Sequence, residues 1–415
     1  MAEAATQGSA IIDAETRHEL SEWVDGNWSS DLTLGEWWDR LGRSGWGFPD
    51  WPRDWYGRDV SRGAAASISR QLVEMGVLGA PQGVGQLWAA RTLLTHGSDE
   101  QKRDFLEALA TGRENWCQLF SEPTAGSDLA SLTTHAERVE GGWLVTGDKV
   151  WTTLADESER AILIARTDPD ASRGAGLSYF IIDMGQPGVT TRPIVQMDGH
   201  ARFFQVTLSD AWVGEDRLVG MVNEGWQIAR TTLMHERRAS GERRPTAIAA
   251  KPGVLSGALD RRVGELVELE RVSERPAGHA IGTQSLVRLA AEHDRQLEPS
   301  VRHGLIDHFV LTSIHRWNRA RAQADALQGR RTGAEEAIAK LTIARLARLS
   351  RDVGLSIMGA VGMLFRDGSV LDRRVQEVAL SSPSTSIAGG TDEIQRNMIA
   401  ESVLGLPRDG DGERR

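Results

Sequence analysis

The sequence is poor in several features that mark whole classes of protein. It has one cysteine, Cys117, in 415 residues, which excludes an internal disulfide and any zinc site built from cysteines. A single thiol suits a reducing compartment, so we expect a cytoplasmic protein. No apolar run reaches the roughly 18 residues that a membrane-spanning helix needs, and no basic stretch followed by an apolar one opens the chain. We therefore expect no membrane anchor and no secretion signal.

Paired histidines and excess positive charge are also lacking. None of the ten histidines has the HxxxH or HExxH spacing, so no metal site is expected. The net charge of −10 and the isoelectric point of about 5.6 argue against general binding to nucleic acids or anionic membranes. One basic stretch could contact an acidic partner, but a solvated helix face is the simpler interpretation. That stretch contains Arg316, Arg319, Arg321, Arg330 and Arg331.

Three regions with different residue patterns divide the chain. Residues 11–117 have the spacing of amphipathic helices, and residues 118–222 have the two-residue period of strands. Residues 223–406 are helical again, with a poorly patterned insertion or connection at 241–283. A tail at 407–415 is expected to be disordered. The sequence thus predicts an α+β multidomain fold, with an N-terminal helical domain, a central antiparallel β-barrel-like domain and a C-terminal four-helix bundle.

Turn and cap residues locate some elements more closely. "HAERVEGGWLVTGDKVW" predicts a hairpin around Gly141-Gly142, where glycine permits a positive φ. Four further segments of strand length follow it, namely "AILIART", "LSYFIIDM", "VTTRPIVQM" and "RFFQVTLSDAWV". A break at 96–98 should separate two short helices, and Asn223 and Thr391 should each cap a helix.

Two long motifs resemble the acyl-CoA dehydrogenase family, and the resemblance extends over nearly the whole chain. "CQLFSEPTAGSDLASLTTHAERVEGGWLVTGDKVWTT" is similar to the family's flavin-site signature, and "IAGGTDEIQRNMIAESVLGLPR" to its C-terminal signature. "GWGFPDWP" resembles bacterial members. The resemblance implies an FAD-dependent oxidoreductase of fatty acid or lipid metabolism that dehydrogenates an acyl-CoA and passes electrons to an electron-transfer flavoprotein. It also implies a homodimer or homotetramer, with a hetero-oligomer as an alternative.

Several residues match positions that contact the flavin ring in this family. They are Phe120, Ser121, Trp151 and Thr153, in "FSEP" and "VWTT". Apart from the resemblance, these two segments end strands that could meet. Hydroxyls and an indole there suit an aromatic ring with a polar edge. Ser127, in "AGSD", matches a contact to the flavin pyrophosphate or to acyl-CoA.

The resemblance also places FAD contacts in the C-terminal region, where a neighbouring subunit supplies them. The family's R-x-x-F-G run is absent, and "SVRHGLIDHFV" stands in its place, so Arg302 is the candidate for the pyrophosphate. Asp392 and Glu393 would repel a pyrophosphate, so only the backbone beside them is expected to approach it. The other candidates are Ser356, Gly359, Ala360, Gly390, Thr391 and Glu393.

The family's reaction requires a carboxylate that removes the α-proton of the acyl-CoA. In many members a glutamate immediately precedes the "GT" of the C-terminal turn, but Gly389 stands there, leaving room for a bulky acyl group. Glu236, in "TTLMHERRASG", follows Ala229 and Leu233 at helical spacing and falls on the apolar stripe. Some members carry their base at the matching position, and Arg237 matches an arginine beside it.

Other interpretations of the same residues stay open. Glu236 could be a helix-face glutamate paired with Arg230 or Ser240, and Glu377 is a weaker candidate for the base. The fold also occurs in flavin monooxygenases and oxidases, and the chain could be a non-catalytic subunit of a hetero-oligomer. A base near residue 236 favours the dehydrogenase, because a monooxygenase that forms a flavin hydroperoxide does not need it.

Overall fold

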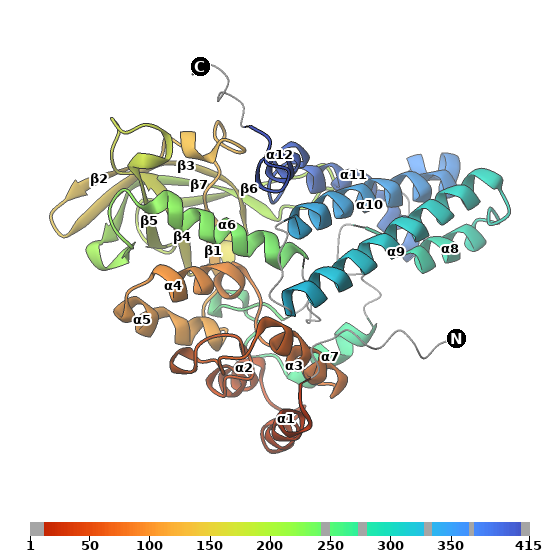
Figure 1. The fold of residues 1–415 in the computed structure, drawn as a ribbon, viewed down its shortest axis with the longest axis horizontal. Coiled ribbons are helices and arrows are strands. Elements are labelled where there is room, and N and C mark those ends of the chain that lie inside the picture. The colour runs from red at the N-terminus through yellow and green to blue at the C-terminus, as the bar shows by residue number, and fades with distance from the viewer. Residues whose placement is uncertain (1–11, 242–249, 273–279, 328–333, 365–368, 408–415) are drawn as a thin grey trace. The chain divides into compact units, whose positions relative to one another are not determined.

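The protein is described by a computed structural model that covers residues 12–241, 250–272, 280–327, 334–364 and 369–407 (Figure 1). The described residues form two compact units. The first contains those up to residue 272 except 197–199, and the second contains residues 197–199 and those from 280 onward. Each unit is described below by itself.

The first unit opens with helices, as predicted. They are α1 (Ala14–Asn27), α2 (Leu34–Arg43), α3 (Arg62–Glu74), α4 (Ala90–His96) and α5 (Asp99–Ala110), with a π-helical turn at Gly85–Ala89 before α4. The predicted break between α4 and α5 is confirmed. Ser98 caps α5 by accepting a hydrogen bond from the Gln101 backbone N–H, and the Gln101 side chain accepts one from Ser98 in return.

Strands follow in the order β1 (Trp116–Leu119), β2 (His135–Val139), β3 (Gly142–Thr153), β4 (Arg160–Arg166), β5 (Leu177–Asp183), β6 (Val189–Ile194), β7 (Phe203–Gly214) and β8 (Leu218–Val219). They form one mostly antiparallel sheet in the order β6-β7-β3-β2-β4-β5-β8, and β1 pairs with β4 in parallel. The strands predicted from the sequence are confirmed. The sheet curves around a barrel-like core that includes Trp143, Leu163 and Val206.

The predicted hairpin is formed by β2 and β3. Gly141 has the positive φ that the turn needs, at +78°. Gly142 already belongs to β3, and glycine is required there for a different reason. A Cβ at Gly142 would lie 2.2 Å from the carbonyl oxygen of Val213 on β7, so this position serves close strand approach.

Helix α6 (Gly225–Gly241) runs across the sheet beside β4 and β5 (Figure 1). Ile228 and Ala229 of α6 are buried with Ile162 and Tyr179 of the sheet in one apolar core. The prediction that Asn223 caps this helix is wrong. Asn223 has a φ of +68°, and its N–H donates to Ser178 Oγ of β5, so it anchors the preceding turn to the sheet instead.

Part of the segment predicted as an insertion packs with the N-terminal helices. Helix α7 (Val263–Val272) places Val263 and Leu266 in the core that contains Leu20 and Trp37. The backbone N–H of Val263 donates to Leu32 O, and that of Leu34 donates to Arg261 O. Residues 250–272 therefore complete the N-terminal core, whereas the sequence placed them within the 223–406 region.

The second unit is helical. It contains α8 (Thr283–Glu292), α9 (Pro299–Leu327), α10 (Glu335–Met358), α11 (Val370–Ser381) and α12 (Asp392–Ser402). Helices α8 to α11 share one apolar core, to which Leu286, Val301, Val353 and Val375 each contribute, in agreement with the predicted bundle. Helix α12 packs against α10. Thr391 caps α12 as predicted, accepting from the backbone N–H of Ile394 at 3.2 Å.

Candidate active site

The segments "FSEP" and "VWTT" meet in the structure, as the sequence predicted. The backbone N–H of Val150 donates to Ser121 O at 2.9 Å, and Lys149 Nζ donates to Phe120 O at 3.1 Å. Since Phe120 and Ser121 follow β1 directly, these bonds fix the end of β1 against β3. The residues predicted to contact a flavin ring therefore come from two segments that are physically joined.

A buried ion pair holds this junction together. Lys149 Nζ lies 3.0 Å from Glu122 Oε1, and both side chains are almost fully buried. Burial alone would raise the pKa of Glu122, but Lys149 and hydrogen bonds from Thr134 and Thr133 outweigh it and lower that pKa to about 2. Burial lowers the pKa of Lys149 to about 8, against the attraction of Glu122. The carboxylate thus stays ionised at neutral pH and orders the loop around it.

Trp151 and Thr153 lie on the exposed side of β3. Trp151 is 59% exposed, and its φ of +63° is unfavourable for a bulky side chain by about 1–2 kcal/mol. Thr152 between them is buried, with its Oγ1 unpaired among the described residues. A left-handed residue that presents an indole to the surface is typical of a binding site rather than of a core. The exposed indole and the Thr153 hydroxyl fit the face and the polar edge of an isoalloxazine ring.

Ser127 is exposed in the turn that follows "FSEP". The turn is closed by hydrogen bonds between the Glu122 and Ala125 backbones, and Asp128 pairs with Arg173 at 2.6 Å. Ser127 therefore has a hydroxyl at the surface of an ordered turn, where a phosphate could reach it.

Glu236 belongs to α6, and its side chain is bound to strand β1. Gln118 Nε2 donates a hydrogen bond to Glu236 Oε2 at 3.2 Å. Burial raises the pKa of Glu236, while the Gln118 hydrogen bond and the positive charge of Arg237 oppose that rise. The structure thus places Glu236 against the sheet, and one of its partners is an amide on β1. A carboxylate with a raised pKa and a fixed orientation is suited to accept a proton.

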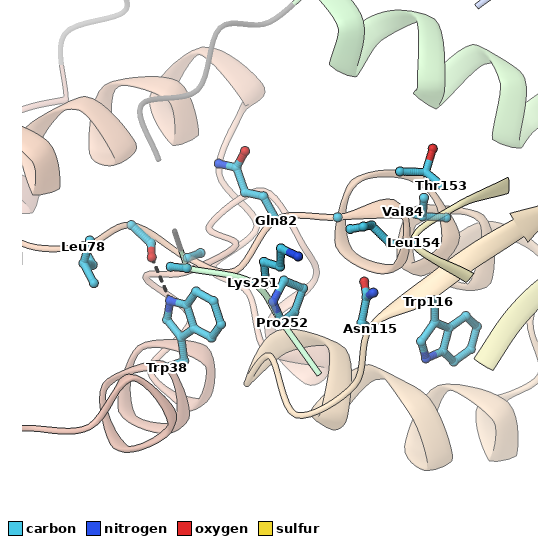
Figure 2. A pocket seen from close by; sticks show the side chains of 14 residues that line it. Trp38, Leu78, Gln82, Val84, Asn115, Trp116, Thr153, Leu154, Lys251 and Pro252 are labelled. Atoms are coloured by element: carbon cyan, nitrogen blue, oxygen red, sulfur yellow. Dashed lines mark hydrogen bonds between the residues drawn. The ribbon is translucent and has the colours of Figure 1, made fainter. Parts of the chain in front are cut away.

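One face of β1 connects this carboxylate to a cavity. Side chains two residues apart on a strand point to the same side, so Trp116, Gln118 and Phe120 share a face. Trp116 and Phe120 belong to the core between the sheet and α6. Trp116 also lines a cavity of about 300 Å³, and Thr153 lines the same cavity (Figure 2). Glu236, the cavity and the exposed end of β3 therefore all lie next to the apolar core between the sheet and α6.

The sequence did not indicate two polar groups near Glu236. Gln118 looked like an ordinary strand residue, and its Oε1 is also buried without a partner among the described residues. His235 is buried beside Arg62, whose Nη2 lies 3.5 Å from its Nδ1. Burial, and then the cations Arg91 and Arg62, lower the pKa of His235 to about 3, so its ring is neutral at neutral pH. The sequence signal that could have indicated these groups was His235, a polar residue directly beside the expected base.

All three regions of the chain match domains of one family of known proteins. The N-terminal, middle and C-terminal domains of acyl-CoA dehydrogenase match residues 9–113, 117–210 and 285–404. The acyl-CoA dehydrogenase IpdE1 of Mycobacterium tuberculosis is 33% identical over 377 residues, covering 91% of this chain and 89% of IpdE1. The chain belongs to the acyl-CoA dehydrogenase family. This membership confirms the predicted fold and the class of FAD-dependent oxidoreductase.

Two further relatives of the acyl-CoA dehydrogenase family are informative. FadE34 of Mycobacterium tuberculosis is 34% identical over 360 residues, which are 87% of this chain but 44% of FadE34, so the chain spans less than half of that relative. The solved structure of a variant of the "Tcur3481-Tcur3483 steroid ACAD" is 25% identical, with a TM-score of 0.69, covering 95% of this chain and 98% of that one.

The C-terminal candidates are all in the second unit. Gly389 and Gly390 have positive φ angles of +67° and +86°, so glycine is needed for the turn itself. Asp392 is buried and paired with Lys340 at 2.9 Å and with Arg348 at 3.2 Å. The charge of Asp392 is therefore neutralised within the protein, which reduces the repulsion expected from the sequence to that of Glu393.

The remaining C-terminal candidates lie at the surface of the second unit. Arg302 is exposed on α9, and Glu393 is exposed in the first turn of α12. Ser356, Gly359 and Ala360 lie at the end of α10, where Arg295 Nη1 donates to Ser356 O at 2.8 Å. Gly359 has a φ of +58°, and a Cβ there would lie 2.9 Å from Arg295 Nη1. The sequence did not single out Arg295.

Two other expectations concern absences. Within the described ranges, no three histidine, cysteine or acidic side chains are grouped as metal ligands. In the same residues, no helix is both long enough and apolar enough to cross a bilayer. Cys117 is fully buried, and burial raises the pKa of its thiol to about 12.

Proposed function

We propose that the chain is an FAD-dependent acyl-CoA dehydrogenase in which Glu236 removes the α-proton of the substrate. The observation that carries this proposal is the hydrogen bond between Gln118 and Glu236. This bond fixes a carboxylate of raised pKa beside the apolar core between the sheet and α6. The exposed end of β3 lies next to the same core. Gly389 carries no carboxylate, so the base must come from elsewhere in the chain.

The environment of Glu236 suits this step. The α-proton of a thioester is weakly acidic, and a carboxylate removed from water becomes a stronger base. Gln118 donates to one carboxylate oxygen and so holds the carboxylate in a fixed orientation. FAD, when bound, supplies the acceptor for the β-hydride at its N5. Arg237, adjacent in sequence, favours the ionised form of Glu236 and is our candidate for a substrate contact.

The cofactor is proposed to lie against the junction of β1 and β3. Phe120 and Ser121 contribute from one segment and Trp151 and Thr153 from the other, joined by the bonds of Lys149 and Val150. Ser127 is proposed to contact the flavin pyrophosphate or the CoA. Gly389 is proposed as a substrate contact because it has no side chain, and a Cβ there would meet nothing within 4 Å.

The C-terminal contacts are proposed to act across a subunit interface. They are Arg302, Ser356, Gly359, Ala360, Gly390, Thr391 and Glu393. Helix α9 exposes Ile306, Val310 and Trp317 on one stripe, with Trp317 63% exposed. A stripe of this kind on a helix of a globular protein indicates burial against another chain. We propose a homodimer or homotetramer, with a hetero-oligomer as the alternative that the paired name of the solved relative raises.

The substrate is proposed to be an acyl-CoA with a branched or ring-bearing acyl group, with electrons passing to an electron-transfer flavoprotein. Two points support the bulky group. One is the absence of a side chain at Gly389, and the other is the likeness to a protein whose title calls it a steroid ACAD. The FadE and IpdE1 names of the relatives agree with lipid metabolism.

The test is the rate of flavin reduction in the Glu236→Gln variant. We expect normal binding of FAD and acyl-CoA, but anaerobic flavin reduction slowed about 10²–10⁴-fold, because a positioned general base is lost. Glu377→Gln tests the weaker candidate for the base in parallel. Glu377 pairs with Arg374 at 3.4 Å, and we expect its replacement to leave flavin reduction at the wild-type rate. Reduction of the Glu236→Gln flavin at the wild-type rate would refute the assignment.

Two further outcomes separate the alternatives. Rapid oxygen consumption with little dye reduction would indicate an oxidase or monooxygenase. A chain that binds FAD only after a second protein is added would indicate a subunit of a hetero-oligomer.

A further inference from the structure

Strand β5 and helix α4 each bring a buried hydroxyl to helix α6, one turn before Glu236. Tyr179 of β5, Thr232 of α6 and Thr92 of α4 are all 0% exposed. Thr92 Oγ1 lies 2.9 Å from Thr232 Oγ1, and Thr232 Oγ1 lies 3.0 Å from the Tyr179 hydroxyl. The sequence did not single out any of these three side chains, and together they join three elements at one buried point.

The shortest contacts give the order in which these hydroxyls donate. Thr92 donates to the carbonyl oxygen of Trp88 at 2.8 Å, so its own oxygen is left to accept from Thr232. The oxygen of Thr232 is in turn left to accept from Tyr179. A longer contact of 3.3 Å joins Thr232 to Ile228 O. Burial raises the pKa of Tyr179, so the phenol keeps its proton and remains a donor at neutral pH.

The ring of Tyr179 makes a second contact, with the segment that follows β1. It packs edge-to-face against Phe120, with the ring centroids 6.0 Å apart and the ring planes at 87°. Aromatic pairs in this arrangement prefer a defined geometry and stabilise the fold beyond their buried area. Phe120 is our candidate for a flavin-ring contact, and its carbonyl oxygen accepts from Lys149. Tyr179 therefore contacts the proposed cofactor segment with its ring and the helix of the proposed base with its hydroxyl.

These contacts close into a ring that includes the proposed base. On one side, Phe120 is joined through Tyr179 to Thr232. On the other side, Gln118 is joined directly to Glu236. Gln118 and Phe120 are two residues apart along an extended segment, a span of about 6.6 Å. Thr232 and Glu236 are four residues apart on one face of α6, a span of about 6 Å. Because the two spans match, α6 cannot slide or rotate against this segment without breaking one of the two contacts.

We propose that Tyr179 and Thr232 are positioning residues, which set the carboxylate of Glu236 relative to the segment that receives the flavin ring. The inference rests on the proposed function and adds two residues to it. Both act through helix α6, and Thr92 anchors their hydroxyls to α4. The position of the carboxylate matters because a displacement of about 1 Å at a reacting centre can slow a reaction about 100-fold.

The first test removes the hydroxyl of Tyr179 and keeps its ring. Flavin reduction is measured anaerobically by stopped flow, with isobutyryl-CoA as a branched probe and 3-cyclohexylpropanoyl-CoA as a ring-bearing one. In Tyr179→Phe we expect FAD binding and KM to stay near their wild-type values, while reduction slows about 10–100-fold. Thr232→Val should slow it to a similar extent. Thr232→Ser should restore the wild-type rate, because it returns the hydroxyl.

Thr231→Val is the matched control. Thr231 adjoins Thr232 on α6 and also contacts α4, where His96 Nε2 lies 2.9 Å from its hydroxyl. It has no place in the ring of contacts that includes Glu236. We therefore expect flavin reduction in Thr231→Val to proceed at the wild-type rate, although this variant also loses a polar contact between α6 and α4.

Two readouts distinguish positioning from a loss of stability alone. In the Glu236→Gln background, Tyr179→Phe should slow the residual reduction no further, because no base is left to position. A purely structural role predicts equal slowing in both backgrounds. In the purified protein without acyl-CoA, the backbone amides of α6 should exchange hydrogen about 2–10-fold faster in Tyr179→Phe than in wild type, because a buried hydrogen bond that holds the helix is lost.

The outcomes separate this inference from the proposed function. Wild-type reduction rates in both Tyr179→Phe and Thr232→Val would overturn the positioning role and leave Glu236 as the base. Equal slowing in the Glu236→Gln background, or an effect of Thr231→Val as large as that of Thr232→Val, would overturn it too. Absence of flavin reduction in wild type with every acyl-CoA tried would refute the proposed function itself. Faster exchange in Tyr179→Phe would then still show that the hydroxyl chain holds α6.

Discussion

An amide on strand β1 fixes the carboxylate on helix α6, because Gln118 Nε2 donates to Glu236 Oε2 at 3.2 Å. Burial raises the pKa of Glu236, and this hydrogen bond and the charge of Arg237 limit the rise. The proposed base is therefore positioned by a residue from another element.

Removing this donor should change the pH dependence of the reaction. Gln118→Leu takes away a hydrogen bond that favours the ionised carboxylate, so the pKa of Glu236 should rise further. The base works only when ionised, so the acidic limb of the kcat/KM profile should move to higher pH. Gln227→Leu, at an exposed position of α6, is the control. An acidic limb that stays in place would show that Gln118 does not tune the base.

Breaking the buried pair at the strand junction should destabilise the protein. Lys149→Met leaves the Glu122 carboxylate buried without its partner, at a cost of about 3–5 kcal/mol. Urea unfolding measures the loss. The double change Lys149→Met with Glu122→Gln should recover part of it, because no charge then remains buried. A double variant no more stable than Lys149→Met would contradict this explanation.

Glu122 also predicts a loss of stability in acid. Its pKa is about 2 in the folded protein, against 4.5 for an unperturbed glutamate, so the unfolded state binds the proton more readily. The stabilisation is complete above about pH 4.5 and is lost as the pH falls towards 2. Thermal unfolding across this range should show a steeper decline in wild type than in Glu122→Gln. Parallel declines would mean that other carboxylates dominate.

Thr153→Val should weaken or retune the flavin without disturbing the fold. Thr153 is exposed at the end of β3, so the loss of its hydroxyl costs the protein little. The flavin would lose one donor to its polar edge, which is about 1–3 kcal/mol of binding. FAD titration and the reduction potential measure the effect. Thr190→Val, on exposed strand β6, is the control, and equal effects of the two changes would remove Thr153 from the site.

Local signals were enough to predict most elements. Thr391 and the break before Asp99 follow from cap residues, and the strands follow from their two-residue period. Glu236 was placed on the apolar stripe of its helix by counting along that helix alone. Each of these predictions depends on residues within a few positions of one another.

The remainder depends on contacts between distant segments. Gln118 gained its role only when β1 was placed beside α6, 118 positions later in the sequence. Asn223 does not cap its helix, and its backbone N–H donates a hydrogen bond to Ser178 of β5 instead. The cavity is lined by residues far apart in the sequence, among them Gly83, Asn115 and Lys251. No pattern in the sequence indicates that these three meet.

The packing of α7 into the N-terminal core has a consequence for synthesis of the chain. Leu266 emerges from the ribosome about 150 residues after the end of α5, which is on the order of ten seconds or more at roughly 5–20 residues per second. During that time the surfaces of Leu20 and Trp37 that α7 covers stay open to water or to a chaperone. A fragment that ends at residue 117 should therefore aggregate, whereas one that ends after α7 should fold with its first core complete.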